Sequence, residues 1–249
     1  MESHKHPTRE APSDSHLRRA GDLDAPRGLR TRRGVVEDRA ASAGVGREEH
    51  RRFLNRYYGV SHHLYDATRK CFLFGRDRAL KHLLAVEWNT LVEVGPGTGR
   101  NLRKLHAGRP QALLGGIDAS DVMLAHARAE CPWARLRHGF AEDAEYTEVL
   151  GAAPERILFS YCLSMVQGRA QALRQARRSL APGGELVVVD FADGLGLPGV
   201  LRRGLHAWLG AFHVAPLDAE LFRDAISVEF GPGRYWMMAR LSRLRGSSE

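Results

Sequence analysis

The sequence has few cysteines and no long apolar run. Cys71, Cys131 and Cys162 are scattered along the chain without the spacing of a metal-binding motif, which indicates reduced thiols and no metal site. No apolar stretch approaches the roughly 20 residues that a membrane-spanning helix needs, and the first residues do not form an apolar secretory segment. We therefore expect a cytoplasmic protein.

Aromatic residues are absent from residues 1–48, which are rich in Arg, Asp, Glu, Ser, Pro and Gly. Such a segment cannot bury enough apolar surface to offset its chain entropy, so we expect a disordered basic and polar tail. The net charge of +8 over 249 residues favours an anionic partner. Nucleic acid and an acidic membrane surface both meet this condition, and charge alone does not choose between them.

A short apolar segment runs into three glycines at residues 91–101 (LVEVGPGTGRN). Glycines at alternate positions let the backbone turn sharply and approach a ligand closely, and the helix expected from Arg100 offers free N–H groups to an anionic group. Asp118 ends the next apolar segment, where a carboxylate can accept hydrogen bonds from both ribose hydroxyls. The pattern predicts a site for a nucleotide-like ligand.

The glycine spacing distinguishes between nucleotides. A dinucleotide fingerprint is G-x-G-x-x-G, whereas this chain has G-x-G-x-G, with Glu93 two residues before the first glycine and a Pro-Gly-Gly turn at residues 182–184. Together with Asp118, these features resemble the class I S-adenosylmethionine (SAM) methyltransferases. The resemblance implies SAM as the cofactor. It assigns to the cofactor Tyr65, Glu93, Gly95, Gly97, Gly99, Asn101, Asp118, Ala119, Met123, Phe140, Ala141, Asp143 and Ser160.

One position departs from the superfamily pattern. Phe140 occupies the place of an acid that often takes the adenine amino group. Phe140 could stack on adenine instead, Ala141 could keep the backbone contact, and Glu142 or Asp143 could reach the amino group. These acids could equally be solvated loop charges.

The remaining pattern alternates strand and helix, as a parallel sheet requires. We expect a Rossmann-like α/β fold, with a mostly parallel seven-stranded sheet that ends in an antiparallel hairpin. N-terminal covering helices at 49–88 would precede a SAM-binding domain at 89–249, and Ser120 would cap a helix. Strands are expected at 90–94, 112–117, 134–138, 155–160, 184–190, 226–230 and 235–241, and helices at 76–86, 100–107, 120–130, 166–180, 198–212 and 217–225.

Methyl transfer from a sulfonium needs orientation and desolvation more than a catalytic triad, and none is visible. The resemblance places Tyr65 and Asp66 over the methionine end of SAM, although Tyr65 could be a packing residue. Tyr161, after the fourth strand, can offer an aromatic face to a cationic nitrogen. A base could assist, and the candidates are His63, Tyr65, Asp66 and Tyr161. The neighbouring Cys162, Leu163 and Met165 are expected in the core.

The segment after the fourth strand contains neither the Asn/Asp-Pro-Pro-aromatic run of nucleic-acid amino-methyltransferases nor a Pro-Cys nucleophile. We therefore expect no nucleic-acid substrate, and the sequence favours a small-molecule or lipid acceptor.

The flanking segments are similar to the bacterial N-methyltransferase of betaine-lipid synthesis. The similarity lies in residues 65–69 (YDATR), 72–76 (FLFGR), 160–165 (SYCLSM), 189–191 (VDF), 207–209 (AWL) and 212–214 (FHV). It implies three methylations of the nitrogen of diacylglyceryl-homoserine. The alternatives are phosphatidylethanolamine, an ornithine lipid or a soluble amine as acceptor, and, less favoured, a SAM-binding module without turnover or a nucleic-acid binder.

Residues 199–212 (GVLRRGLHAWLGAF) fit a lipid substrate. Leu201, Leu205, Trp208, Leu209 and Phe212 share one helix face, with arginines beside it. Such a helix can lie in a bilayer interface, at the inner face of the cell membrane, or can simply cover a sheet. The cations expected to hold a homoserine carboxylate are Arg69, Arg76, Arg202 and Arg203.

Overall fold

The computed structural model describes residues 73–212 and 214–244. The expected tail at 1–48 and most of the expected covering helices lie outside the described residues, as do His63, Tyr65, Asp66 and Arg69. The strands are β1 (Thr90–Val94), β2 (Leu113–Asp118), β3 (Arg135–His138), β4 (Arg156–Ser160), β5 (Glu185–Phe191), β6 (Ser227–Phe230) and β7 (Trp236–Ser242).

Helices alternate with the first five strands. They are α2 (Arg76–Ala85), α3 (Arg100–Gly108), α4 (Asp121–Glu130), α5 (Tyr146–Leu150), α6 (Arg169–Ser179) and α7 (Gly199–Ala211), with 3₁₀ turns η1 (Leu163–Met165), η2 (Ala219–Phe222) and η3 (Pro232–Arg234). No helix among the described residues is both long and apolar enough to cross a membrane.

The seven strands form one sheet in the order β3-β2-β1-β4-β5-β7-β6. The first five strands are parallel, and β7 pairs antiparallel with both β5 and β6. The expected fold class is therefore confirmed, including the antiparallel hairpin, whose turn lies at Gly231-Pro232-Gly233. Because β2 and β4 flank β1 on opposite sides, the crossover direction reverses at β1, and ligands bind in such sheets at this point.

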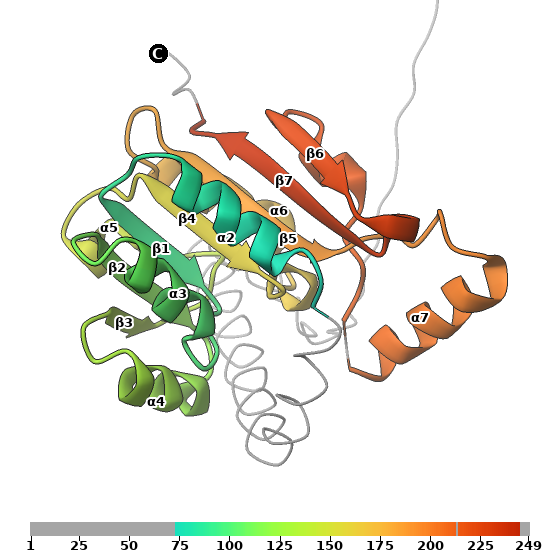
Figure 1. Cartoon of the computed structure of the whole chain (residues 1–249), viewed down its shortest axis with the longest axis horizontal. Helices are drawn as coiled ribbons and strands as arrows, with labels where there is room; N and C mark the ends of the chain where they lie inside the picture. The colour runs from blue at the N-terminus through green and yellow to red at the C-terminus, as the bar shows by residue number, and fades with distance from the viewer. Residues whose placement is uncertain (1–72, 213, 245–249) are drawn as a thin grey trace, which may run out of the picture. The chain divides into compact units, whose positions relative to one another are not determined.

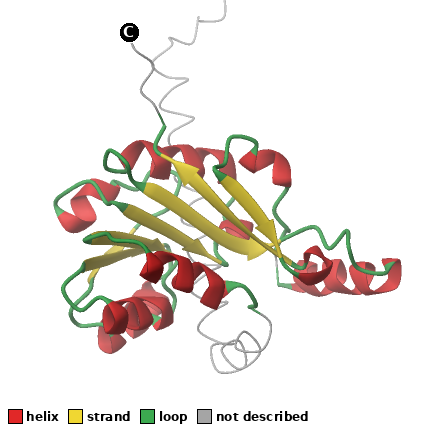
Figure 2. Ribbon diagram, turned by 45° about the horizontal axis from the view of Figure 1, so that its top comes forward, coloured by secondary structure: helices red, strands yellow, loops and turns green. Residues whose placement is uncertain are grey.

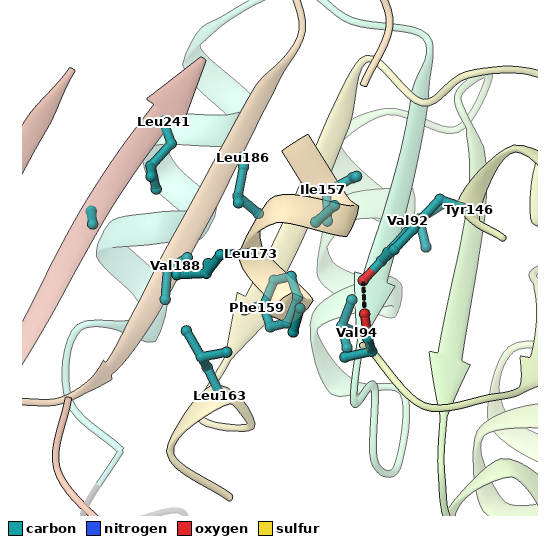
Figure 3. Close-up of a cluster of buried hydrophobic side chains, with 14 of the residues drawn as sticks. Val92, Val94, Tyr146, Ile157, Phe159, Leu163, Leu173, Leu186, Val188 and Leu241 are labelled. Atoms are coloured by element: carbon teal, nitrogen blue, oxygen red, sulfur yellow. Dashed lines mark hydrogen bonds between the residues drawn. The ribbon is translucent and has the colours of Figure 1, made fainter. Parts of the chain in front are cut away.

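Helices cover both faces of the sheet (Figures 1 and 2). The central strands are buried on both sides, since alternate residues of one strand enter different cores. Leu158 packs with α2 and α3, whereas Ile157 and Phe159 pack with α5 and α6. Figure 3 shows the second of these cores, with side chains from β1, β4 and β5 meeting Tyr146 and Leu173. This two-layered packing fixes the carboxyl ends of β1, β2 and β4 relative to one another.

Local structure follows the sequence closely, with two exceptions. The Ser120 side chain caps α4 by accepting from the N–H of Met123 at 3.4 Å, as expected. The expected helix at 217–225 is only the turn η2, because the Leu217 N–H donates to the Phe191 carbonyl and holds the segment extended before it can turn. The short helix α5 was not expected.

Candidate active site

A cleft of about 690 Å³, including its open mouth, lies at the carboxyl ends of β1, β2 and β4. Among the residues that the sequence assigns to a site, the cleft is lined by Gly95, Gly97, Asp118, Ala119, Met123, Phe140, Ala141 and Tyr161. The sheet thus brings together residues that are up to 66 positions apart in the sequence, from Gly95 to Tyr161.

The loop after β1 supplies the near wall. Gly95 and Gly97 have φ angles of 65° and 56°, in the left-handed region that other residues rarely adopt. They differ in their surroundings: a Cβ on Gly95 would lie 2.7 Å from the Cβ of Cys162, whereas a Cβ on Gly97 would meet no heavy atom within 4 Å. Gly95 is therefore required for packing, and Gly97 leaves space open at the cleft wall.

Asp118 joins this loop to the end of β2. Its Oδ2 accepts from the Gly97 N–H at 3.3 Å and its Oδ1 accepts from the Ser120 N–H at 2.9 Å. The side chain lines the cleft, although the residue is only 9% exposed. The backbone contacts fix the carboxylate in position at the cleft wall, where a ligand can reach it.

Glu93, Asn101, Gly99 and Ser160 do not line the cleft. Glu93 is buried beneath the loop, where its Oε1 accepts from the Asn101 Nδ2 at 2.7 Å. Its Oε2 and the hydroxyl of Ser160 are buried and have no hydrogen-bond partner among residues 73–212 and 214–244. Burial raises the pKa of Glu93 to about 8, while the Asn101 hydrogen bond and the charge of Arg76 lower it.

The stability of the protein should depend on pH through Glu93. The folded protein keeps a proton there that the unfolded chain releases above its ordinary pKa of 4.5. This contribution is complete below pH 4.5 and is lost as the pH rises to about 8, at about 1.4 kcal/mol per pH unit within that window. Glu93→Gln keeps the acceptor for Asn101 and cannot ionise. In denaturant unfolding, the free energy of unfolding of Glu93→Gln should therefore increasingly exceed that of the parent as the pH rises across this window. An advantage that stays constant with pH would contradict the burial of a titrating carboxyl group.

Tyr161 follows β4 and forms part of the opposite wall. It is 1% exposed and has a φ of 55°, an unusual value for a side-chain-bearing residue and one that is often found at functional sites. Its hydroxyl donates to the Phe74 carbonyl, so a role as a base would require this bond to break. The ring packs edge to face on Phe191, with centroids 4.7 Å apart.

Further rings continue from Phe191. Tyr235 lies 5.7 Å and Trp208 lies 6.2 Å from it between centroids, both edge to face. We call Tyr161, Phe191, Trp208 and Tyr235 the aromatic group. It links the cleft wall to α7.

Cys162, Leu163 and Met165 were expected in the core, and Cys162 does pack partly against it. The Cys162 and Met165 side chains line the cleft, whereas Leu163 is fully buried. The Cys162 thiol donates to the Val94 carbonyl at 3.0 Å, and burial raises its pKa well above the usual value, so it is not a reactive thiolate. Asp190 holds this segment, because its carboxylate accepts from the Ser164 N–H at 2.9 Å.

The far end of the cleft lies where β2 and β3 end. Phe140 and Ala141 line it, together with Glu142, whose Oε1 accepts from the Gly168 N–H at 3.1 Å. Asp143 is exposed and is not part of the lining, so Glu142 is the better placed of the two acids. The sequence reasoning did not single out Val94, Ile117, Gly139 and Val166, which also line the cleft.

Comparisons with known proteins agree with this geometry. The family model of a methyltransferase domain matches residues 91–184, from β1 to the turn before β5. A trans-aconitate 2-methyltransferase from Acidovorax sp. (strain JS42) is 34% identical over 108 residues, which are 43% of this chain and 40% of the relative. A demethylmenaquinone methyltransferase from Tropheryma whipplei (strain Twist) is 33% identical over 139 residues, 51% of this chain and 54% of the relative. The matches therefore span about half the length of these relatives.

Solved structures share the fold. A SAM-dependent methyltransferase from Thermotoga maritima superposes with a TM-score of 0.55 at 16% identity, covering 76% of this chain and 99% of that one. The plantazolicin methyltransferase BamL was solved with a triazolic desmethylPZN analog and SAH. It superposes with a TM-score of 0.54 at 15% identity, covering 74% of this chain and 77% of that one. Residues 91–184 therefore match a methyltransferase domain, and the chain shares its Rossmann-like fold with the solved Thermotoga maritima protein.

Proposed function

We propose that the chain is a SAM-dependent N-methyltransferase that methylates the amino group of a lipid head group, converting diacylglyceryl-homoserine to its trimethylated betaine form. The matched relatives bear the names of other acceptors, trans-aconitate and demethylmenaquinone. The family model ends at residue 184, so it does not cover α7 or the hairpin, which supply Trp208 and Tyr235. The similarity of the flanking segments to betaine-lipid N-methyltransferases supports the lipid substrate.

The cleft fits the cofactor. Asp118 would hold the ribose hydroxyls, Phe140 and Ala141 would contact the adenine, and Gly97 leaves the loop backbone open to the ligand. When bound, SAM supplies a methyl group already activated by a positive sulfur. The chain then has to orient an amine in line with that group and exclude water from the reacting atoms.

The aromatic group is the main structural support for methylation of a nitrogen. Tyr161 lines the cleft, and Phe191, Trp208 and Tyr235 extend from it as a continuous set of ring contacts. Aromatic faces attract cations, by about 2 kcal/mol or more where water is excluded. A methylated amine carries a positive charge after each transfer, so the ring of Tyr161, the member of the aromatic group that lines the cleft, favours a nitrogen acceptor over a carboxylate.

Incubation of the purified chain with radiolabelled SAM and defined acceptors tests the proposal. We expect label in diacylglyceryl-homoserine, with mono-, di- and trimethylated products resolved by chromatography. Phosphatidylethanolamine, an ornithine lipid, soluble amines, trans-aconitate and demethylmenaquinone serve as competing acceptors. Label confined to water-soluble products would exclude a lipid acceptor, and SAM binding without any methylated product would indicate a binding module.

The loop glycines give a matched pair of variants. Both Gly95→Ala and Gly97→Ala place a Cβ at positive φ, which costs about 1–2 kcal/mol. Only the first also clashes with Cys162, at 2.7 Å, so Gly95→Ala should lower the melting temperature further. Gly97→Ala should instead weaken SAM binding, about tenfold or more, because its methyl group occupies open space at the cleft. Equal melting temperatures in the two variants would contradict this division of roles.

A further inference from the structure

Helix α7 stands out to the side of the sheet in both views (Figures 1 and 2). It follows β5 through a short loop, and Leu209 is its one buried residue. Leu205 and Trp208 pack partly against the core that contains α2. One side of α7 therefore packs partly against this core, and its other side faces away from it.

The first turn of α7 exposes apolar side chains. Val200 is 72% and Leu201 is 61% exposed, and Leu195, in the loop before the helix, is 58% exposed. The sequence pattern placed Leu201 on the face that packs, yet it lies beyond the part of the helix that contacts the core. Large aliphatic side chains that are exposed within one short segment, residues 195–201, are the kind of feature that marks an interaction site.

The same turn is positively charged. Arg202 and Arg203 follow Leu201 directly, Arg203 is exposed, and α7 contains no acidic residue. The nearest preceding acid, Asp193, pairs with Arg234, whose Nε lies 2.8 Å from its Oδ1. No acidic side chain within α7 therefore offsets the two arginines.

We propose that this end of α7 docks the protein on an anionic membrane surface, with Leu195, Val200 and Leu201 inserted among the lipids and Arg202 and Arg203 against their phosphates. The proposal rests on the lipid substrate proposed above and extends it with the surface that presents the enzyme to that substrate. Exposed leucines and adjoining arginines are the pattern of helices that lie in a bilayer interface. Arginines alone would suit nucleic acid, but aliphatic side chains gain nothing from a phosphate backbone.

Sedimentation of the full chain with vesicles tests the surface. Binding to phosphatidylcholine vesicles that contain about 30% phosphatidylglycerol should greatly exceed binding to vesicles of phosphatidylcholine alone, and it should fall with added salt. Leu201→Asp should reduce binding about tenfold or more. Ile226→Asp is the matched control, since Ile226 is 57% exposed on another part of the molecule, and it should bind as the parent does.

A second pair tests the charge. Arg202→Gln/Arg203→Gln should weaken vesicle binding about 25-fold, because each arginine near an anionic surface contributes roughly fivefold. Arg174→Gln/Arg178→Gln, on the exposed side of α6, should have no such effect.

Parent-like vesicle binding by Leu201→Asp would overturn the proposal. A lower melting temperature of that variant would also overturn it, because the patch would then pack on this chain. The same holds if the parent sediments as a dimer and the variant as a monomer, because the patch would then pack on a second copy. Tighter retention of RNA than of vesicles would also overturn it.

Activity measurements separate this proposal from the proposed function. Leu201→Asp should methylate substrate dispersed in detergent micelles at the parent's rate and substrate in vesicles at least tenfold more slowly. If the parent methylates no lipid in either form, the proposed function fails. The docking surface is then judged separately, by whether the parent binds vesicles. If the variant slows equally in micelles and vesicles, Leu201 serves the active site and the docking surface is wrong.

Discussion

Replacing Asp118 with alanine should weaken SAM binding by about 100-fold or more. A carboxylate that accepts two ribose hydroxyl groups contributes roughly 1.5–3 kcal/mol per charged hydrogen bond, and a change of 1.4 kcal/mol is tenfold in affinity. Calorimetric titration of the parent and the variant with SAM measures the difference directly. The variant should still fold, but its free energy of unfolding should fall by about 1–3 kcal/mol, because the Gly97 and Ser120 N–H groups lose their acceptor.

The control for this result is Asp121→Ala. Asp121 is three residues further along, at the start of α4, and its side chain is 52% exposed. It should bind SAM nearly as the parent does. Asp118→Asn, which retains one oxygen acceptor, should lie between the two. Equal affinities for the parent and Asp118→Ala would mean that the ribose is held elsewhere.

Replacing Tyr161 with leucine should slow methylation by about 30-fold with SAM saturating. The aromatic face that stabilises a cationic nitrogen is worth about 2 kcal/mol in a desolvated site, and leucine removes it while filling a similar space. Tyr161→Phe keeps the ring and loses only the hydroxyl bond to the Phe74 carbonyl, so its turnover should stay within a few-fold of the parent. Single-turnover rates with diacylglyceryl-homoserine measure both variants.

The comparison of these two variants separates two roles of the residue. If Tyr161→Phe is as slow as Tyr161→Leu, then the hydroxyl and not the ring carries the effect, and a base role regains support. If neither variant is slowed, the acceptor does not approach this wall, and the argument for a nitrogen acceptor loses its main observation.

The sequence was a good guide to the cofactor side of the site, because the determinants there are local. Short apolar runs located β1 and β2, and the residue types at Gly97 and Asp118 are required by backbone geometry and charge. Phe140 and Ala141 also lie in the cleft, as the resemblance implied.

The acceptor side was harder to predict, because it depends on which chain segments meet in space. Cys162 and Met165 look like core residues in the sequence, and only the bend of the chain after β4 turns them to the cleft. Phe191, Trp208 and Tyr235 come from β5, α7 and the hairpin, and no sequence spacing indicates that their rings touch Tyr161 or one another. The exposure of Leu201 likewise depends on where α7 leaves the core.

A crystal structure of the full chain with SAH tests the central claim most directly. We expect the nucleoside in the cleft, with both ribose hydroxyls within hydrogen-bonding distance of the Asp118 carboxylate, the adenine beside Phe140, and the sulfur facing Tyr161. A structure with the nucleoside bound away from the β1 loop, or with the Asp118 carboxylate turned away from the ribose, would contradict the account.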